Sequence, residues 1–286
     1  MTSETAVLLI HCPDRKGIVA TVAQFLYING ANILHADQHQ DNDAGLFFMR
    51  VEFDLKGFRL RGEDALRKEF QPIADEFRMQ WRVAYSSARP AVAIFVSKYL
   101  HCLLDLLYRN SIGELPCRMA LIISNHTDAK ELAAFYDVPF HLFPIDAGSK
   151  RKAEAAQQKL LEDNRIELIV LARYMQVLSK EFVDRYPQQI INVHHSFLPA
   201  FSGARPYRAA HERGVKLIGA TSHYVTEALD DGPIIEQDVV RVSHRDQVED
   251  LVKKGRDLER VVLSRAVRWH LENRILQYSR KTVIFD

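Results

Sequence analysis

The densest group of side chains that could carry chemistry follows the apolar pair Ile190-Ile191 and reads Asn192-Val193-His194-His195-Ser196. We expect Gln189–Val193 to form a strand, so Asn192 and His194, two residues apart, point to the same face. An amide donor and an imidazole on one face can converge on one substrate atom. Together they can polarise a carbonyl group and move a proton.

A second polar group occurs further along the chain, in Leu229-Asp230-Asp231-Gly232-Pro233-Ile234-Ile235. Glycine and proline mark a loop there, and a loop carboxylate beside a histidine can orient the ring and raise its basicity. Each motif alone is more often structural, because Asn-x-His also ends ordinary strands and Asp-Asp-Gly is a common turn.

Zinc bound by His194, His195 and His223 is an alternative use of the histidines. The sequence offers no His-Glu-x-x-His helix, and its three cysteines, Cys12, Cys102 and Cys117, form no CxxC pair. An odd number of scattered cysteines fits buried thiols in a reducing compartment. We therefore expect no metal site.

Composition narrows the class of protein. The 286 residues are 47% hydrophobic and 26% charged, which is the balance of a folded globular protein of about two domains. Lys and Arg total 38 against 37 Asp and Glu, a net charge of +1, so no strong field attracts nucleic acid or anionic lipid. Apolar runs are far shorter than the ~18 residues of a membrane span, and the first residues do not resemble a secretory signal. We expect a cytoplasmic protein.

The first part of the chain, residues 1–86, predicts a small α/β domain. Its pattern favours strand, helix, strand, strand, helix, strand, at Thr5–Ile10, Ile18–Ile28, Asn32–Gln40, Leu46–Leu55, Gly62–Phe77 and Met79–Tyr85. This βαββαβ order is ferredoxin-like. Ser86–Pro90 is the expected linker.

Residues 90–286 predict a doubly wound α/β domain. Strands alternate with helices, at Ala91–Val96, Arg118–Ser124, Phe140–Phe143, Glu167–Leu171 and Gln189–Val193. Ligands of such sheets bind beyond the carboxyl ends of the strands. Four polar segments follow strands: Ser97-Lys98, Asn125-His126, Arg173-Tyr174 and Asn192–Ser196. Ser243 and Asp246 resemble a capping box that opens a helical tail, Gln247–Ile275.

Three separated motifs in this domain resemble the formyltetrahydrofolate-dependent formyltransferase family. They are Asn192–Pro199, Gly219–Val225 and Asp230–Ile235, and they occur in the family's order. The resemblance implies that Asn192, His194 and Asp230 form the catalytic set, with the Asn192 amide and His194 as donors to the oxyanion. It leaves open whether Asp230 is the base or holds His194 in its useful tautomer.

The N-terminal motifs Cys12–Val19 and Asn29–Ile33 resemble the ACT family of small-molecule sensing modules. That resemblance implies an amino-acid effector near Asp14, Gly17 and Asn32, and a homo-oligomer. The alternative is that these three residues only form a turn and a helix cap. An ACT domain joined to this formyltransferase-like domain, with 202–207 reading Ser-Gly-Ala-Arg-Pro-Tyr, resembles the family of 10-formyltetrahydrofolate deformylases.

One segment departs from the related ribonucleotide transformylases, which are expected to hold the substrate phosphate on a glycine-rich loop after the first strand. The corresponding stretch here, Val96–Cys102, has no glycine and carries Tyr99 and Leu100. The departure implies that the second substrate is water. The low net charge also disfavours a tRNA acceptor.

The resemblance therefore implies hydrolysis of 10-formyltetrahydrofolate to formate and tetrahydrofolate, in one-carbon metabolism and in support of purine synthesis. The folate is the substrate, and no separate cofactor is implied. The implied walls of its pocket are Met175, Gln176, Val177, Leu178, His195 and His223. Plain core packing is the alternative for Met175, Leu178 and the two histidines. Formyl transfer to an amine and folate sensing without catalysis are the competing functions.

Overall fold

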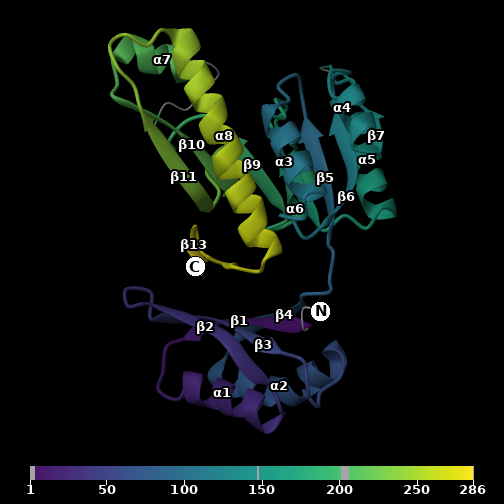
Figure 1. Cartoon of the computed structure of the whole chain (residues 1–286), viewed down its shortest axis with the longest axis vertical. Coiled ribbons are helices and arrows are strands. Elements are labelled where there is room, and N and C mark those ends of the chain that lie inside the picture. The colour runs from purple at the N-terminus through teal and green to yellow at the C-terminus, as the bar shows by residue number, and fades with distance from the viewer. Residues whose placement is uncertain (1–3, 147, 201–205, 286) are drawn as a thin grey trace. The chain divides into compact units, whose positions relative to one another are not determined.

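The computed structural model describes residues 4–146, 148–200 and 206–285 (Figure 1). The chain forms two compact units. One comprises Met1–Ala88 with Asn273–Tyr278 and Val283–Asp286, and the other comprises Arg89–Glu272 with Ser279–Thr282. The break after Ala88 lies within the expected linker, whereas the two C-terminal segments group with the first unit and not with the second.

The first unit has the expected βαββαβ order. Its elements are β1 (Thr5–Pro13), α1 (Ile18–Ile28), β2 (Asn32–Asp41), β3 (Leu46–Asp54), α2 (Glu63–Phe77) and β4 (Gln80–Tyr85). The sheet runs in the order β2-β3-β1-β4. Leu8 and Ile10 of β1 pack with Phe25 of α1 and Phe70 of α2 on one face.

The other face of this sheet is covered by the C-terminal strand pair, β12 (Ile275–Tyr278) and β13 (Lys281–Ile284). Leu276, Val283 and Phe285 pack there against Val7, Leu9 and Phe48. This second apolar layer explains why β1 is an unbroken apolar run and not an alternating one.

The second unit is built on a seven-stranded sheet in the order β11-β10-β9-β8-β5-β6-β7. Its strands are β5 (Ala91–Val96), β6 (Arg118–Ser124), β7 (Phe140–Leu142), β8 (Leu168–Leu171), β9 (Ile190–His194), β10 (Leu217–Tyr224) and β11 (Ile234–Arg241). The first five are parallel, and β10 runs antiparallel between β9 and β11. The chain moves outward from β5 to β7 and then returns to β8 on the other side of β5. Strand order therefore reverses between β5 and β8, the place where such sheets bind ligands.

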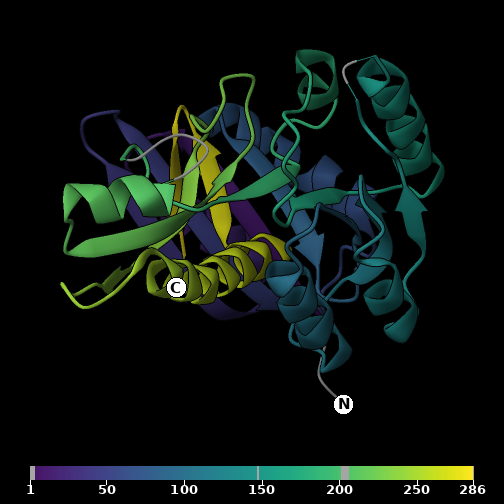
Figure 2. The same ribbon diagram turned by 90° about the horizontal axis from the view of Figure 1, so that it is seen from above.

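Helices cover both faces of this sheet. They are α3 (His101–Ser111), α4 (Lys130–Phe135), α5 (Lys150–Asp163), α6 (Lys180–Asp184), α7 (Pro206–Arg213) and α8 (Val248–Leu271). Phe95 of β5 shares a core with Leu161 of α5 and Phe182 of α6. The long helix α8 contacts α3 and lies along β9, β10 and β11, as Figure 2 shows from above.

The helical tail differs from its expected bounds. Helix α8 begins at Val248, and the capping box that opens it pairs Gln247 with Asp250. Ser243 and Asp246 form a turn before the helix, where the Ser243 amide donates to the Asp246 carboxylate. The helix ends at Leu271 because Asn273 adopts a left-handed φ of 55°, and Ile275 already belongs to β12.

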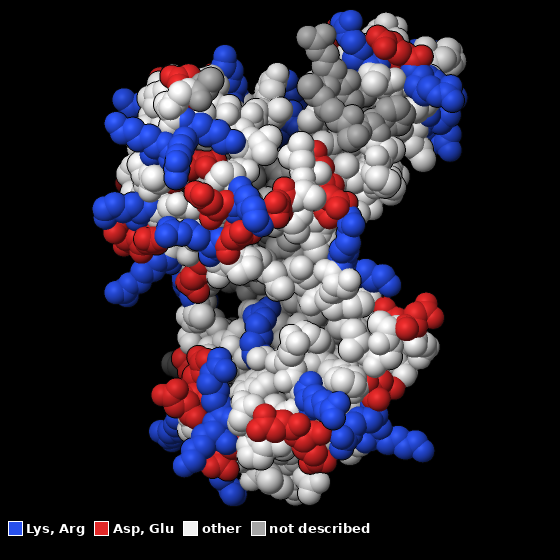
Figure 3. Space-filling model, turned by 180° about the vertical axis from the view of Figure 1, so that it is seen from behind, with Lys and Arg blue, Asp and Glu red and all other residues white. Residues whose placement is uncertain are grey.

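Charges of both signs are intermingled over the face drawn in Figure 3, without a region where one sign gathers. This agrees with the nearly neutral composition. None of the described helices combines the length and the apolar composition that crossing a bilayer requires.

A substitution of Phe182 tests how strongly the packing of α6 against the seven-stranded sheet stabilises the second unit. The Phe182 ring is fully buried and lies 6.1 Å from Phe95 and 5.5 Å from Tyr186, measured between ring centroids. We expect Phe182→Ala to lower the free energy of unfolding of the second unit by about 3–5 kcal/mol, measured by urea denaturation. The matched variant Phe135→Ala removes a ring that is 80% exposed and should leave stability nearly unchanged. Equal losses in both variants would contradict this account of the core.

Candidate active site

The polar segments that follow the parallel strands meet at one edge of the sheet. Ser97, which follows β5 and is buried, donates through Oγ to Asn125 Oδ1 at 2.7 Å. The same Oγ accepts from the Met175 amide at 3.0 Å, and the Ser97 amide donates to the Arg173 carbonyl at 3.2 Å. The first of the expected polar segments thus fixes the backbone of the 173–178 segment.

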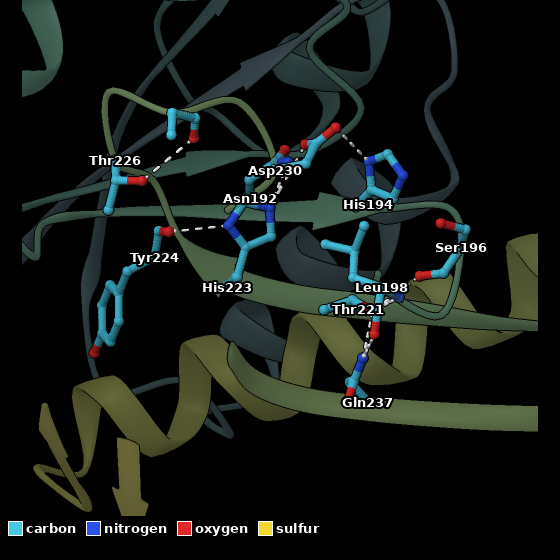
Figure 4. Close-up of polar contacts among 11 residues, drawn as sticks. Asn192, His194, Ser196, Leu198, Thr221, His223, Tyr224, Thr226, Asp230 and Gln237 are labelled. Carbon is cyan, nitrogen blue, oxygen red and sulfur yellow. Dashed lines mark hydrogen bonds and ion pairs between the residues drawn. The ribbon is translucent and has the colours of Figure 1, made fainter. Parts of the chain in front are cut away.

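Strand β9 presents Asn192 and His194 toward the loop that follows β10 (Figure 4). Because β10 runs antiparallel to β9, His223 stands directly opposite Asn192. The β10–β11 pairing shifts register at this point: Ser222 pairs with Glu236 and His223 pairs with Ile234, so Ile235 of β11 is the extra residue. The irregularity lies beside His223.

Asp230 contacts the two histidines of these strands. Its Oδ2 lies 3.2 Å from His194 Nδ1, and its Oδ1 lies 3.8 Å from His223 Nε2. The hydrogen bond from His194 holds the pKa of the Asp230 carboxyl below its usual value, although burial acts in the opposite sense. Asp230 therefore stays ionised near neutral pH, and an ionised carboxylate can only accept. His194 Nδ1 therefore carries the proton of this hydrogen bond, and Nε2 is the ring nitrogen that is left to contact a ligand.

His194 Nε2 is buried and makes no hydrogen bond within the described residues. The whole side chain is only 7% exposed. A buried ring nitrogen without a partner is costly unless a ligand satisfies it, so this atom is the one in the His194–Asp230 pair that a bound ligand could contact.

His223 orients Asn192. Its Nδ1 lies 2.9 Å from the Tyr224 carbonyl oxygen, which can only accept, so Nδ1 carries the proton. Burial lowers the pKa of His223, and the ring is neutral. Its Nε2 must then accept, and Asn192 Nδ2 donates to it at 3.2 Å. This bond fixes which way the Asn192 amide points and leaves the second N–H of Nδ2 for a substrate oxygen.

The loop that carries Asp230 has a demanding backbone. Asp230 itself has a left-handed φ of 54°, and a Cβ added to Gly232 would lie 1.7 Å from the Tyr224 carbonyl oxygen. Arg280 donates to both the carboxylate and the carbonyl oxygen of Asp231. The Thr282 hydroxyl donates to the Ile234 carbonyl at 2.6 Å. Close packing and these two side chains hold the Asp230 carboxylate in place.

A cavity of about 900 Å³, which we call the main cavity, opens beside these groups. The expected binding residues all line it, together with Asn192, His194 and Asp230: Met175, Gln176, Val177, Leu178, His195 and His223. Val225 and Leu229 add apolar wall, and Arg173, Glu227 and Asp231 add charge. An apolar slot with a few convergent polar groups at one end is the usual form of a small-molecule site.

His195 stands beside His194, with ring centroids 5.0 Å apart. Burial, together with the charges of Arg173 and His194, lowers the pKa of His195 to about 4. The ring is therefore neutral at physiological pH. It does not compete with His194 for the charge of Asp230.

The expected effector residues of the first unit are not gathered in one chain. Gly17 begins α1 with a φ of 99°, and Asp14 follows β1, where it accepts from Gln40. Asn32 is paired opposite Asp54 at one end of β3, whereas Pro13 is paired opposite Leu46 at its other end. Eight residues of strand, ~26 Å, separate those two ends.

Sequence reasoning missed a buried acidic group, Glu259 of α8. Its carboxylate accepts from Tyr207 Oη at 2.6 Å, lies 2.7 Å from His101 Nε2 and lies 3.4 Å from Arg173 Nε. Burial opposes its ionisation, but the hydrogen bond from His101 and the Arg173 charge hold the pKa of Glu259 below its usual value. A charged residue on the apolar stripe of an amphipathic helix was the available signal.

The closest grouping of possible metal ligands differs from the three histidines considered in the sequence. Among the described residues, the ligand atoms that lie within 4.8 Å of one another belong to His101, Cys102 and Glu259, not to His194, His195 and His223. Burial raises the pKa of the Cys102 thiol well above its usual value, so it is not a thiolate. Glu259 is already engaged by its neighbours.

Of the 202–207 motif that was singled out in the sequence, positions 202–205 lie outside the described residues.

A substitution of Gly232 tests the packing of the loop that carries Asp230. We expect Gly232→Ala to displace the Asp230 carboxylate, because a methyl group cannot occupy the space beside the Tyr224 carbonyl oxygen. A misplacement of ~1 Å at a reacting group typically costs ~100-fold in rate. Catalytic rate and thermal stability of the variant would be measured together. The control Gly148→Ala changes a glycine that, like Gly232, has no positive φ, but where an added Cβ would lie 3.6 Å from Asp146 Oδ1, an ordinary contact; an equal loss there would refute the packing argument.

The low pKa of His195 predicts a dependence of stability on pH. In the unfolded chain this histidine binds a proton below about pH 6.5, but in the folded chain it does so only near pH 4. The unfolded state therefore gains protons first, and stability falls as pH drops through this window. We expect about 2 kcal/mol to be lost between pH 7 and pH 5, measured by urea unfolding at each pH.

His195→Gln should remove this part of the pH dependence. The exposed His244 serves as the control, since His244→Gln should retain it. An unchanged slope in His195→Gln would show that other groups cause the acid sensitivity.

Comparison with known proteins adds independent information. Residues 91–267 match the Formyl transferase family and residues 6–60 match the ACT domain family. A curated formyltetrahydrofolate deformylase from Synechocystis sp. is 55% identical over the full length of both chains. The crystal structure of a formyltetrahydrofolate deformylase from Pseudomonas syringae pv. tomato is 48% identical, with a TM-score of 0.97, and covers 100% of this chain and 95% of that one.

The second unit also resembles a more distant enzyme, glycinamide ribonucleotide transformylase 1 from Symbiobacterium toebii. That structure is 30% identical with a TM-score of 0.66, and it covers 71% of this chain and 97% of that one. The added ACT match and the full-length identity distinguish the two relationships. The chain belongs to the formyltetrahydrofolate deformylase family.

Proposed function

We propose that this protein hydrolyses 10-formyltetrahydrofolate and releases formate and tetrahydrofolate. The observation that carries the proposal is the convergence of Asn192, His194 and Asp230 on the wall of the main cavity. Such a set supplies what formamide hydrolysis needs: a donor for the developing oxyanion, a group that moves a proton, and a carboxylate that orients it. The relatives that carry the deformylase name support the choice of substrate.

In the proposed mechanism, the Asn192 N–H that is not used by His223 donates to the formyl oxygen. Neutral His194 takes a proton from water through Nε2 while the water oxygen bonds to the formyl carbon, giving a tetrahedral oxyanion. The protonated ring then gives that proton to N10 as the C–N10 bond breaks. Formic acid leaves and ionises to formate. Asp230 accepts from Nδ1 throughout and stabilises the charged ring.

This assignment makes Asp230 a positioning residue and His194 the base. Asp230 Oδ2 already accepts a hydrogen bond from His194 Nδ1. If this oxygen deprotonated water directly, it would lose the bond that lowers the pKa of the Asp230 carboxyl. The mechanism asks for no metal ion or separate cofactor, because Asn192 polarises the carbonyl and His194 moves the proton.

The apolar walls of the main cavity suit the pterin ring of a folate. Met175, Val177 and Leu178 follow β8, and the backbone of this segment is fixed through Ser97. Exposed backbone groups of an ordered segment can pair with the polar edge of a flat heterocycle.

Formate release in the absence of any amine acceptor tests the proposal. The wild type should turn over, whereas Asn192→Ala and Asp230→Asn should each lose about 100- to 1,000-fold in kcat. The surface variant Asp163→Asn, in an exposed pair with Lys159, should be as active as the wild type. Binding of the folate by each variant, measured by calorimetry, separates lost catalysis from lost affinity.

The competing functions give different results in the same assay. A folded wild type that binds the folate but releases no formate is not a hydrolase. Formylation of an added amine would then indicate a transferase, and binding without either reaction would indicate a sensor.

We further propose a cytoplasmic enzyme of one-carbon metabolism whose formate supports purine synthesis. Its three free cysteines fit a reducing compartment. An amino-acid effector of the ACT domain is also proposed. Because Asn32 and Asp14 lie at opposite ends of the sheet, one effector site with both residues would need two copies of the chain, which supports a homo-oligomer.

A further inference from the structure

A second cavity of about 320 Å³ adjoins the main cavity within the second unit. We call it the arginine cavity, because Arg173, Arg208 and Arg256 line it. His195, Met175 and Arg173 line both cavities, so the two spaces meet at these side chains. The hydrolysis mechanism uses none of the three arginines.

The arginine cavity carries uncompensated positive charge. Its one carboxylate, Glu259, is engaged by Tyr207 and His101 and also faces Arg173. Neither Arg208 nor Arg256 pairs with a carboxylate anywhere in the described part of the chain. Arg173 Nε is buried and makes no hydrogen bond there. Guanidinium groups present forked donors that match a carboxylate.

The main cavity holds a carboxylate beside the reacting groups. Of the three acidic residues that line it, Asp231 is paired with Arg280 and Glu227 with Lys180, whereas the contacts of Asp230 among the described residues are with His194 and His223. A product that becomes an anion beside Asp230 is repelled by that carboxylate as soon as it ionises. The arginine cavity, reached past His195, is the adjoining space where an anion is stabilised.

We propose that the arginine cavity binds the small carboxylate product, formate, and separates it from tetrahydrofolate, which leaves through the main cavity. This inference rests on the proposed function. It divides the two products by size and place: the apolar walls of the main cavity hold the ring system of the folate, and the arginines of the smaller cavity take the small anion. Arg208 and Arg256 lie on α7 and α8 and belong to this subsite alone.

Product inhibition by added sodium formate tests the proposal. Initial rates would be measured for the wild type, Arg256→Gln, Arg208→Gln and the double variant. We expect the inhibition constant for formate to rise about 5-fold in each single variant and further in the double variant. The KM for 10-formyltetrahydrofolate should stay within about twofold, because these arginines do not line the main cavity.

Two matched variants complete the design. Arg256→Lys keeps the charge but not the fork and should show a smaller rise than Arg256→Gln. Arg151→Gln removes an exposed arginine of α5 that lines neither cavity and should leave formate inhibition unchanged. Thermal unfolding of each variant verifies that it folds.

Formate inhibition that is identical in the wild type and the double variant would overturn the proposal. A rise in KM for the folate by the same factor as the rise in the formate constant would also overturn it, because the arginines would then act on the substrate. If the wild type releases no formate, the proposed function fails. Titration of the protein with ¹³C-formate by NMR still decides whether Arg208 and Arg256 hold the anion.

Discussion

The hydrogen bond between His194 Nδ1 and Asp230 Oδ2 is the contact on which the candidate active site depends. At 3.2 Å it fixes the tautomer of His194, and it keeps the carboxylate ionised in a partly buried position. A proton on Nδ1 leaves Nε2 as the ring nitrogen that can contact a substrate. This atom is buried and has no hydrogen-bond partner among the described residues. Without Asp230 the ring could adopt either tautomer, and the direction of proton transfer would be lost.

Long-range structure keeps that contact in place. Asp230 lies in a loop after β10, and β10 is aligned against β9 by its antiparallel register. The loop closes tightly because Gly232 allows the Tyr224 carbonyl to approach, and Arg280 and Thr282, from the turn after β12 and from β13, bond to its backbone. Side chains near the end of the chain thus contribute to the geometry of a site formed by residues far away in the sequence.

Much of the fold and half of this geometry could be predicted from the sequence, for physical reasons that differ between residues. Asn192 and His194 share a face because a strand repeats every two residues, which is a local rule. The partnership with Asp230 depends on strand pairing across a loop, which no spacing rule supplies; it was expected only from the resemblance to known formyltransferases.

The same limit explains what was missed or misplaced. Glu259 is surrounded by groups from α3, α7 and the segment after β8, so its network is invisible to periodicity. The end of α8 was placed too late because the apolar residue Ile275 continues the pattern of the helix, whereas the left-handed turn at Asn273 sends it into a strand. The strand pair β12–β13 forms a sheet of its own and packs against the sheet of the first unit through apolar side chains, a contact that leaves no local signature in the sequence.

The protonation states around Asp230 form one arrangement. Burial lowers the pKa values of His195 and His223, so both rings are neutral while the carboxylate is charged. A charged ring at either position would share the negative charge of Asp230 and weaken its hydrogen bond with His194. A neutral His223 can also accept from Asn192, which a protonated ring cannot do. The same burial that makes these two histidines poor bases therefore leaves His223 as the acceptor for the Asn192 amide and His194 as the histidine that donates to Asp230.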